Sequence, residues 1–238
     1  MTSRDTTTVR INKYLADQGH ATRKEADTLI QKGLVTVNGK RAELGMRVSA
    51  SDVVSVRGTG KAFVYLAFHK PKDVVTLAQT KGEKDVLFFL PPDLRRLKLF
   101  PVGRLDKASS GLLIVTNDGR VTDRLLNPQR SHEKTYVVTT KKPLRESFKQ
   151  YMEKGVDIEG YQTLPARIRI LGEKKFQITL TEGKRHQIRR MVVAMHNEVA
   201  ELTRASIMNV DLARLPAGGY RPIQGEELET FLSKLGLT

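Results

Sequence analysis

The chain has 238 residues, which suffice for one domain of ordinary size and a small second one. It contains no cysteine, which excludes disulfides and thiolate metal sites, and its five histidines form no ligand-like spacing. No apolar run approaches the roughly 18 residues of a membrane span. The first eight residues lack the apolar core of a signal peptide. We therefore expect a soluble, cytoplasmic protein without a metal ion. Its residues 1–8 are expected to form a disordered lead-in.

The charge is strongly basic. Lys and Arg number 41 against 26 Asp and Glu, which gives a net charge of +15. Such an excess destabilises a compact chain by self-repulsion unless a polyanion relieves it, so nucleic acid is the expected partner. Aromatic residues make up only 6% and Trp is absent. Extended base stacking along a single strand is therefore not the expected binding mode.

Residues 9–57 form a separate module that opens with two expected helices. Apolar residues fall at helical spacing over 11–15. A capping box follows, with Thr22 as the N-cap and Glu25 reaching back to it. The helix that it opens is expected to end at Gly33.

The second half of this module reads as a small sheet. Residues 34–37 alternate like a strand, Asn38-Gly39 is typical of a hairpin turn, and residues 53–56 give another short strand. Helix, helix and then Val-x-Val-Asn-Gly-Lys resembles the small RNA-binding domain first described in ribosomal protein S4. That resemblance implies an S4-like RNA-binding domain over residues 9–57.

Two cations in this module stand where local physics disfavours them. Arg23 and Lys24 occupy the first turn of the expected helix, where the helix dipole repels positive charge. An external phosphate would favour them there, although a solvated basic surface is the simpler interpretation. The candidates for RNA contact in this module are Lys13, Arg23, Lys24, Lys40 and Arg41.

Residues 58–62 read as a flexible linker, and residues 63–238 as a second domain. Strands are expected over 64–71, 112–116, 134–140, 167–171, 176–181, 199–202 and 205–210. Helices are expected over 121–126, 143–155 and 187–196, with a solvated acidic helix at 226–229. Strands outnumber helices and rarely alternate with them one for one. This order predicts an α+β fold with a mixed, largely antiparallel sheet flanked by helices.

One stretch, Gly103 to Gly119, carries the strongest functional signal. It places Asp106 on a small-residue turn before a buried strand, which is how a scaffold commonly presents a working carboxylate. A loop salt bridge from Arg104 to Asp106 is the alternative for an isolated Arg-x-Asp. The whole string, however, resembles the active-site motif of the pseudouridine synthases, in the branch that modifies ribosomal RNA.

The resemblance extends to three later segments, residues 132–136, 182–191 and 204–210. It implies that Asp106 is the catalytic aspartate, that Tyr136 is the active-site tyrosine, and that Arg189 is the arginine partner of the aspartate. A half-buried strand aromatic is the alternative for Tyr136, and His186 is assigned no role. The remaining candidates for substrate or RNA contact are Arg104, Leu105, Lys107, Lys184, Arg185, Gln187 and Ile188.

The chemistry of this family suits these residue types. Pseudouridine formation breaks the bond between ribose and uracil, turns the base and rejoins it through carbon. A carboxylate such as Asp106 can serve as nucleophile at the anomeric carbon or as base at the neighbouring ribose position, and the sequence leaves both open. An Arg guanidinium beside the aspartate would keep it ionised, and a Tyr ring would stack on the flipped base.

We therefore expect a cofactor-free pseudouridine synthase that acts on a uridine of ribosomal RNA. The patterns around residues 133–139 and 208–210 look most like those of the large-subunit enzymes. Ribosomal RNA is the expected partner of a monomer that contacts neither DNA nor a membrane. One alternative is a non-catalytic RNA-binding or ribosome-assembly protein. A second, an RNA-cleaving enzyme, would need an acid–base pair or metal ligands that the sequence does not offer.

Overall fold

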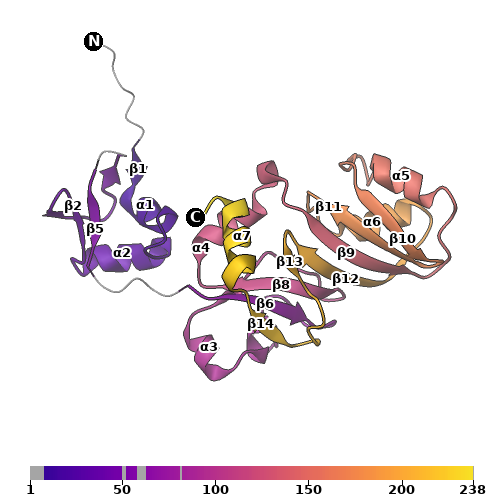
Figure 1. Ribbon diagram of the computed structural model, residues 1–238, viewed down its shortest axis with the longest axis horizontal. Helices are drawn as coiled ribbons and strands as arrows, with labels where there is room; N and C mark the ends of the chain where they lie inside the picture. The colour runs from indigo at the N-terminus through magenta and orange to yellow at the C-terminus, as the bar shows by residue number, and fades with distance from the viewer. Residues whose placement is uncertain (1–7, 50–51, 58–62, 81, 238) are drawn as a thin grey trace, which may run out of the picture. The chain divides into compact units, whose positions relative to one another are not determined.

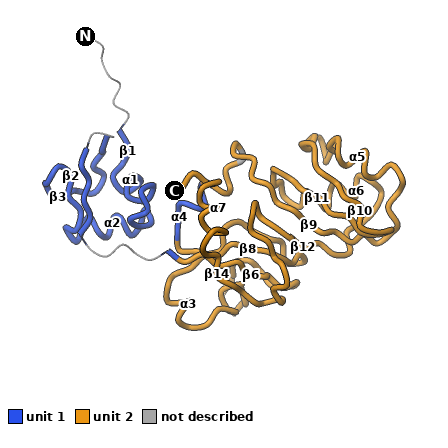
Figure 2. The backbone as a smooth tube through the Cα atoms, viewed as in Figure 1, with its two compact units in different colours: residues 1–63, 118–123 blue, residues 64–117, 124–238 orange. Residues whose placement is uncertain are grey.

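The computed structural model describes residues 8–49, 52–57, 63–80 and 82–237. The chain divides into two compact units, which Figure 2 shows in different colours. One comprises residues 1–63 with 118–123, and the other residues 64–117 with 124–238. The predicted linker at 58–62, and the predicted lead-in except Thr8, lie outside the described residues. The domain limits inferred from the sequence therefore stay predictions.

The N-terminal unit contains the two expected helices. They are α1 (Ile11–Asp17) and α2 (Arg23–Gln31), and their apolar faces meet in one core. The capping box is present, because the Thr22 hydroxyl accepts from Glu25 N at 3.3 Å and the Glu25 carboxylate accepts from Thr22 N at 3.2 Å. This reciprocal bonding fixes the start of α2 where the sequence predicts it.

Five short strands complete the unit. They are β1 (Val9–Arg10), β2 (Val35–Val37), β3 (Lys40–Arg41), β4 (Arg47–Val48) and β5 (Val54–Val56). Strand β1 pairs with β4, and β2 lies between β3 and β5 in an antiparallel sheet. The turn between β2 and β3 has positive φ at both Asn38 and Gly39, as the hairpin prediction requires.

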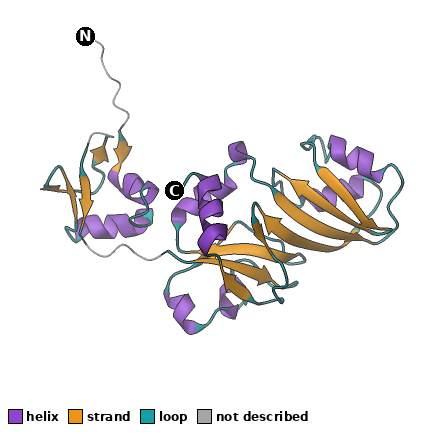
Figure 3. Cartoon of the chain, viewed as in Figure 1, coloured by secondary structure: helices purple, strands orange, loops and turns teal. Residues whose placement is uncertain are grey.

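The second unit is built on one mixed sheet (Figures 1 and 3). Its order is β10-β11-β9-β12-β8-β6-β14, with β7 added to β8 and β13 to β12. All pairs are antiparallel except β12 with β8. The strands are β6 (Tyr65–Lys70), β7 (Phe100–Val102), β8 (Ser110–Thr116), β9 (Lys134–Thr140), β10 (Arg167–Gly172), β11 (Lys175–Leu180), β12 (Val199–Ile207), β13 (Val210–Asp211) and β14 (Tyr220–Pro222). The predicted α+β class is confirmed.

Helices flank this sheet and divide its core in two. They are η1 (Val86–Phe89), α3 (Pro92–Arg96), η2 (Pro128–Arg130), α5 (Phe148–Lys154), α6 (Gln187–Ala194) and α7 (Gly225–Leu235). Helix α4 (Gly119–Leu126) is divided between the two units. Helices α5 and α6 pack with β9, β10 and β11 into one apolar cluster, while η1 packs with β6 and β8 into another. Tyr136 contacts both clusters, so it stands where the two cores meet.

The two halves of the sheet join through one short contact. Strands β8 and β12 pair in parallel over only two positions, Ser110 with Thr203 and Gly111 with Arg204. Gly111 has φ +114°, and a Cβ there would lie 2.4 Å from both the N and the O of Arg204. Only glycine allows the strands to approach this closely.

Three elements differ from the sequence predictions. The helix expected over 143–155 is wrong at its start, because α5 begins at Phe148 and Leu144 N donates instead to Glu173 O at 2.8 Å. The two late strands are largely one strand, β12, with register shifts. Helix α7 is longer than the predicted acidic segment and buries Phe231 and Leu235, so it is amphipathic rather than solvated all round.

Replacement of Gly111 by alanine tests the junction. We expect Gly111→Ala to destabilise the protein by about 2–4 kcal/mol, since the new methyl overlaps backbone and the residue keeps a positive φ. That loss lowers the melting temperature by about 5–10 °C. Gly172→Ala is the matched control, because nothing lies within 4 Å of its added Cβ. Equal melting temperatures for the two variants would contradict the account of the junction.

Candidate active site

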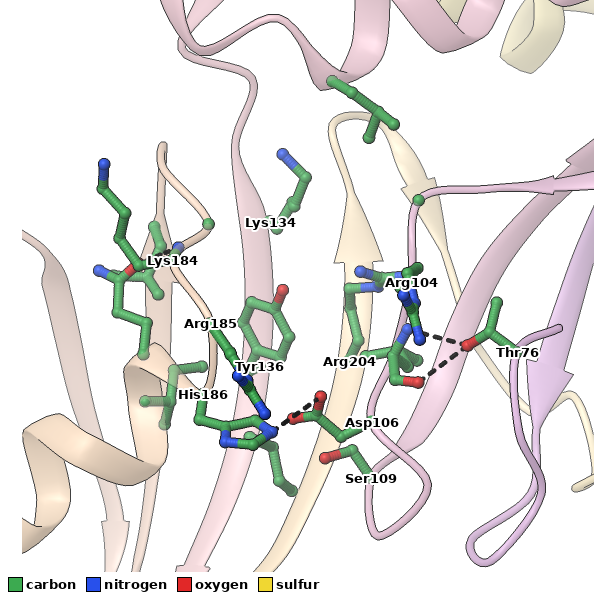
Figure 4. A pocket seen from close by; sticks show the side chains of 18 of the residues that line it. Thr76, Arg104, Asp106, Ser109, Lys134, Tyr136, Lys184, Arg185, His186 and Arg204 are labelled. Carbon is green, nitrogen blue, oxygen red and sulfur yellow. Dashed lines mark hydrogen bonds and ion pairs between the residues drawn. The ribbon is translucent and has the colours of Figure 1, made fainter. Parts of the chain in front are cut away.

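A cleft of about 970 Å³ opens over the middle of the second unit's sheet. Its floor is formed by β9 and β12, and its walls by the loop that precedes β8 and the loop that precedes α6 (Figure 4). Asp106 stands on the first wall, as the sequence predicts for a presented carboxylate. Each of the second domain's predicted site residues lines this cleft.

The Asp106 loop is fixed from below by two buried side chains. Thr76 Oγ1 donates to Leu105 O at 2.8 Å and accepts from Leu105 N at 3.1 Å (Figure 4). Lys70 Nζ donates to the carbonyls of Pro71 at 2.8 Å, Val74 at 2.5 Å and Lys107 at 3.3 Å. The residues on either side of Asp106 are thus tied to the chain that follows β6.

Lys70 is fully buried at the end of β6. Burial lowers the pKa of its ammonium group to about 8, although the nearby charges of Asp73 and Asp106 work in the opposite direction. Its three carbonyl acceptors satisfy all three N–H donors of the ammonium group. A buried charge that is so completely bonded fixes the backbone around it. The sequence analysis assigned no role to Lys70.

The carboxylate of Asp106 faces a histidine that sequence reasoning left without a role. His186 Nε2 lies 3.4 Å from Asp106 Oδ1, and the two side chains are 47% and 43% exposed (Figure 4). His186 directly precedes α6 and has φ +52°, a left-handed conformation. The position just before the predicted helix was the available signal, because a residue there can turn towards a neighbouring loop.

Arg189 bonds the turn that follows Asp106. Its Nη2 donates to Ala108 O and to Ser109 Oγ, both at 3.2 Å. Its pairing with the Asp106 carboxylate stays a prediction. Because α6 begins at Gln187, Arg189 lies in its first turn and reaches the turn after the aspartate. Arg189 therefore braces the Asp106 loop.

The floor of the cleft carries Tyr136 between two cations. Lys134 lies two residues earlier on β9, on the same face of the strand, and Arg204 is the β12 residue directly opposite Tyr136. Arg204 is almost fully buried, and its Nε donates to Leu112 O at 2.7 Å. Sequence reasoning noted the segments that carry Lys134 and Arg204 but gave neither residue a role. The alternation of residues along β9 could have indicated Lys134.

The opposite wall is held by one carboxylate. Glu182 accepts from Tyr161 Oη and from Gln187 Nε2, both at 2.7 Å, and Gln187 Oε1 accepts from Lys184 N at 2.9 Å. The predicted RNA contact Gln187 is thus buried and used within the loop. Lys184 Nζ lies 4.4 Å from the centre of the Tyr161 ring. The network orders the loop that carries Lys184, Arg185 and His186.

The N-terminal unit has a basic groove of its own. It encloses about 390 Å³ and is lined by Thr8, Val9, Arg10, Asn12, Lys13, Arg23 and Arg47. Two of the predicted RNA contacts, Lys13 and Arg23, therefore come together there with two further arginines. Lys24, Lys40 and Arg41 are not among the lining residues. Arg41 instead donates to Gln31 O at 2.9 Å and braces the end of α2.

Metal ligation finds no support in the described residues, which contain no group of three or more His, Cys, Asp or Glu placed to hold an ion. None of the helices in the described part of the chain is long and apolar enough to cross a membrane.

Comparison with known proteins identifies the family. Residues 64–194 match the family of RNA pseudouridylate synthases, and residues 9–54 match the S4 domain. The chain belongs to the RNA pseudouridylate synthase family. Both resemblances expected from the sequence are confirmed, and RNA is the partner of this synthase.

Several relatives match most of the synthase. The dual-specificity RNA pseudouridine synthase RluF of Salmonella typhi is 39% identical over 93% of the chain and 78% of its own length. The ribosomal large subunit pseudouridine synthase B of Bacillus subtilis is 36% identical over 92% of the chain and 94% of its own length. The ribosomal small subunit pseudouridine synthase A of Pasteurella multocida is 33% identical over 94% of the chain and 99% of its own length. A crystal structure of a pseudouridylate synthase superposes with a TM-score of 0.69 at 29% identity, covering 95% of the synthase and 99% of that chain.

The two hydrogen bonds between the Thr76 hydroxyl and the Leu105 backbone predict the effect of a nearly isosteric substitution. We expect Thr76→Val to leave two buried backbone groups unpaired and so to loosen the Asp106 loop. The single-turnover rate of pseudouridine formation should fall about 10- to 100-fold, because small misplacements of a catalytic group are costly. RNA affinity should stay unchanged. Thr139→Val on β9, outside the cleft, is the control; equal rates for both variants would show that Thr76 does not position Asp106.

Proposed function

We propose that this synthase converts a uridine of ribosomal RNA, in the large subunit, into pseudouridine, with Asp106 acting on the ribose. The observation that carries the proposal is the placing of Asp106 in a cation-lined cleft beside Tyr136, on a loop that Lys70 and Thr76 hold from below. The names of the relatives support a ribosomal substrate, since two of them act on ribosomal subunits. The patterns at residues 133–139 and 208–210 favour the large subunit.

The reaction requires an ionised Asp106. As nucleophile, the carboxylate attacks C1′ of the ribose while the C1′–N1 bond breaks; as base, it removes the proton from C2′. Both routes conserve every atom of the nucleotide, so neither needs an oxidant, a reductant or a cofactor. Arg104, Arg185 and His186 line the same cleft as Asp106.

The target uridine has to leave its stack in order to reach Asp106. The cleft, at about 970 Å³, accommodates a flipped nucleotide, and the exposed face of Tyr136 offers a ring on which uracil can stack. Unstacking costs a few kcal/mol and is cheapest in an irregular RNA segment. A loop or strained stem of ribosomal RNA therefore suits the site better than a regular duplex.

The basic groove of the N-terminal unit supports sequence-independent binding of the RNA backbone. Arg10, Lys13, Arg23 and Arg47 converge on it, which makes it a site for phosphate groups. A ribosomal RNA substrate implies a cytoplasmic enzyme that needs neither DNA nor a membrane. The proposed form of the enzyme is a monomer.

Mapping pseudouridine in ribosomal RNA tests the proposal. Cells that lack the protein should lack one or more pseudouridines of large-subunit RNA, and the wild-type chain should restore them. Asp106→Asn should not restore them, because an amide is neither a nucleophile nor a base of comparable strength. The purified variant should bind RNA with wild-type affinity. An identical map with and without the protein would contradict the ribosomal substrate, and restoration by Asp106→Asn would remove Asp106 from its role.

A salt titration of RNA binding tests the groove. We expect Lys13→Ala/Arg23→Ala to weaken binding at low salt and to reduce the slope of log affinity against log salt by roughly 1.4–1.8, at 0.7–0.9 for each lost phosphate contact. The chemical step on bound RNA should not change. Lys32→Ala, an exposed lysine outside the groove, is the control. A slope that stays at the wild-type value would mean that Lys13 and Arg23 are only solvated.

A further inference from the structure

Two cations on the cleft floor, Lys134 and Arg204, have no ion-pair partner among the described residues. Lys134 Nζ donates to a neutral carbonyl, His132 O, at 3.2 Å. Arg204 is 3% exposed, and its buried Nη2 has no hydrogen-bond partner among the described residues. An unpaired buried donor destabilises the folded protein. Such a group in a substrate cleft indicates that its acceptor arrives with the substrate.

The two cations also disfavour each other. Burial, and then the charge of Arg204, lower the pKa of Lys134 to about 8, so the ammonium is still charged at neutral pH. The carboxylates that line the cleft are engaged elsewhere. Asp106 faces His186, Glu182 bonds Gln187, and Glu83 accepts from Gln79 N. The pair therefore favours a ligand that carries acceptor oxygens or negative charge.

Position selects the part of the substrate that meets these cations. Tyr136 lies beside both of them, Lys134 along β9 and Arg204 across on β12. In Figure 4, Arg204 lies to the right of Tyr136 and above Asp106, and Lys134 lies beyond the hydroxyl end of Tyr136. A base that stacks on Tyr136, with its ribose at Asp106, directs its ring edge at the two cations. Arg204 belongs to the floor of the cleft, which a flipped base enters and a backbone phosphate does not.

We propose that Lys134 and Arg204 bind the carbonyl oxygens of the target uracil and stabilise the negative charge that the base acquires when it leaves the ribose. This inference rests on the proposed function and adds the base-binding part of the same site.

The charge arises from the bond changes. When the C1′–N1 bond breaks, its electron pair stays with the base, which becomes a uracil monoanion with charge on N1, O2 and O4. The anion then turns, and C5 bonds C1′ while the Asp106–C1′ ester bond breaks or, on the base route, while C2′ regains its proton from Asp106. Loss of the C5 proton and protonation of N1 complete the isomer. Two fixed cations at the carbonyl edge lower the energy of that anion.

The same contacts would select the base. Uracil presents carbonyl oxygens at positions 2 and 4, and both accept from Lys134 and Arg204. Cytosine carries an amino group at position 4, which is a donor and would face a cation with no acceptor. A site lined by hydrogen-bond donors rejects cytosine strongly, because the amino group of the base and the donor that faces it both lose their hydrogen bonds.

Single-turnover kinetics at saturating enzyme test the inference. We expect Lys134→Met to slow pseudouridine formation about 100-fold, the usual cost of one lost donor to a developing anion. RNA affinity and its salt slope should stay at the wild-type values. Lys134→Arg should restore most of the rate. Lys175→Met, which removes the charge of an exposed lysine on β11 outside the cleft, is the control and should match the wild type.

Substrates with 2-thiouridine or 4-thiouridine at the target add a readout that a structural role would not move. Sulfur is a poor hydrogen-bond acceptor. One of the two thio substrates should therefore lower the rate of the wild type relative to uridine, and the same substrate should not lower the rate of Lys134→Met any further. A wild-type rate in Lys134→Met, or equal thio effects in both proteins, would overturn the inference. Weaker RNA binding with a reduced salt slope would overturn it too, by assigning Lys134 to a phosphate. If the wild type itself made no pseudouridine, the proposed function would fail instead.

Discussion

The short parallel contact between β8 and β12 is the constraint on which the site depends. Two residue pairs join the half of the sheet that carries the Asp106 loop to the half that carries Tyr136. The second half packs against α6. Gly111 allows the approach, because any Cβ there would overlap the Arg204 backbone. The same contact places the side chain of Arg204 beneath the cleft. The active site is thus an outcome of how two apolar cores are joined.

The second requirement is a rigid carboxylate on an exposed loop. Loops are normally mobile, but this one is anchored by a buried ammonium, a buried hydroxyl and the guanidinium of Arg189. Each anchor bonds backbone atoms beside Asp106 and leaves the carboxylate itself open to the cleft. Preorganisation of this kind places the reacting group before the substrate arrives, so less reorganisation is needed during the reaction.

Local signals in the sequence predicted local structure well. The capping box at Thr22, the hairpin at Asn38-Gly39 and the strand over 134–140 depend on neighbouring residues, and the structure has them. The hydrogen-bond partners of Arg189 and the course of residues 143–147 were not predictable in this way. Both are decided by contacts with segments distant in sequence, the turn after Asp106 for the first and Glu173 for the second. The resemblance to a family motif was sufficient to predict which residues line the cleft. The roles of the cations Lys134 and Arg204 could be inferred only from the folded structure.

The central claim is that this chain, alone and without a metal ion, isomerises uridine in ribosomal RNA. The most direct test incubates the purified protein with a large-subunit RNA fragment that holds the mapped uridine, in the presence of a metal chelator, and then separates the nucleosides. The account predicts conversion of that uridine to pseudouridine in stoichiometric yield, with the RNA intact. Failure to convert it, or conversion only after a metal or cofactor is added, would contradict the account.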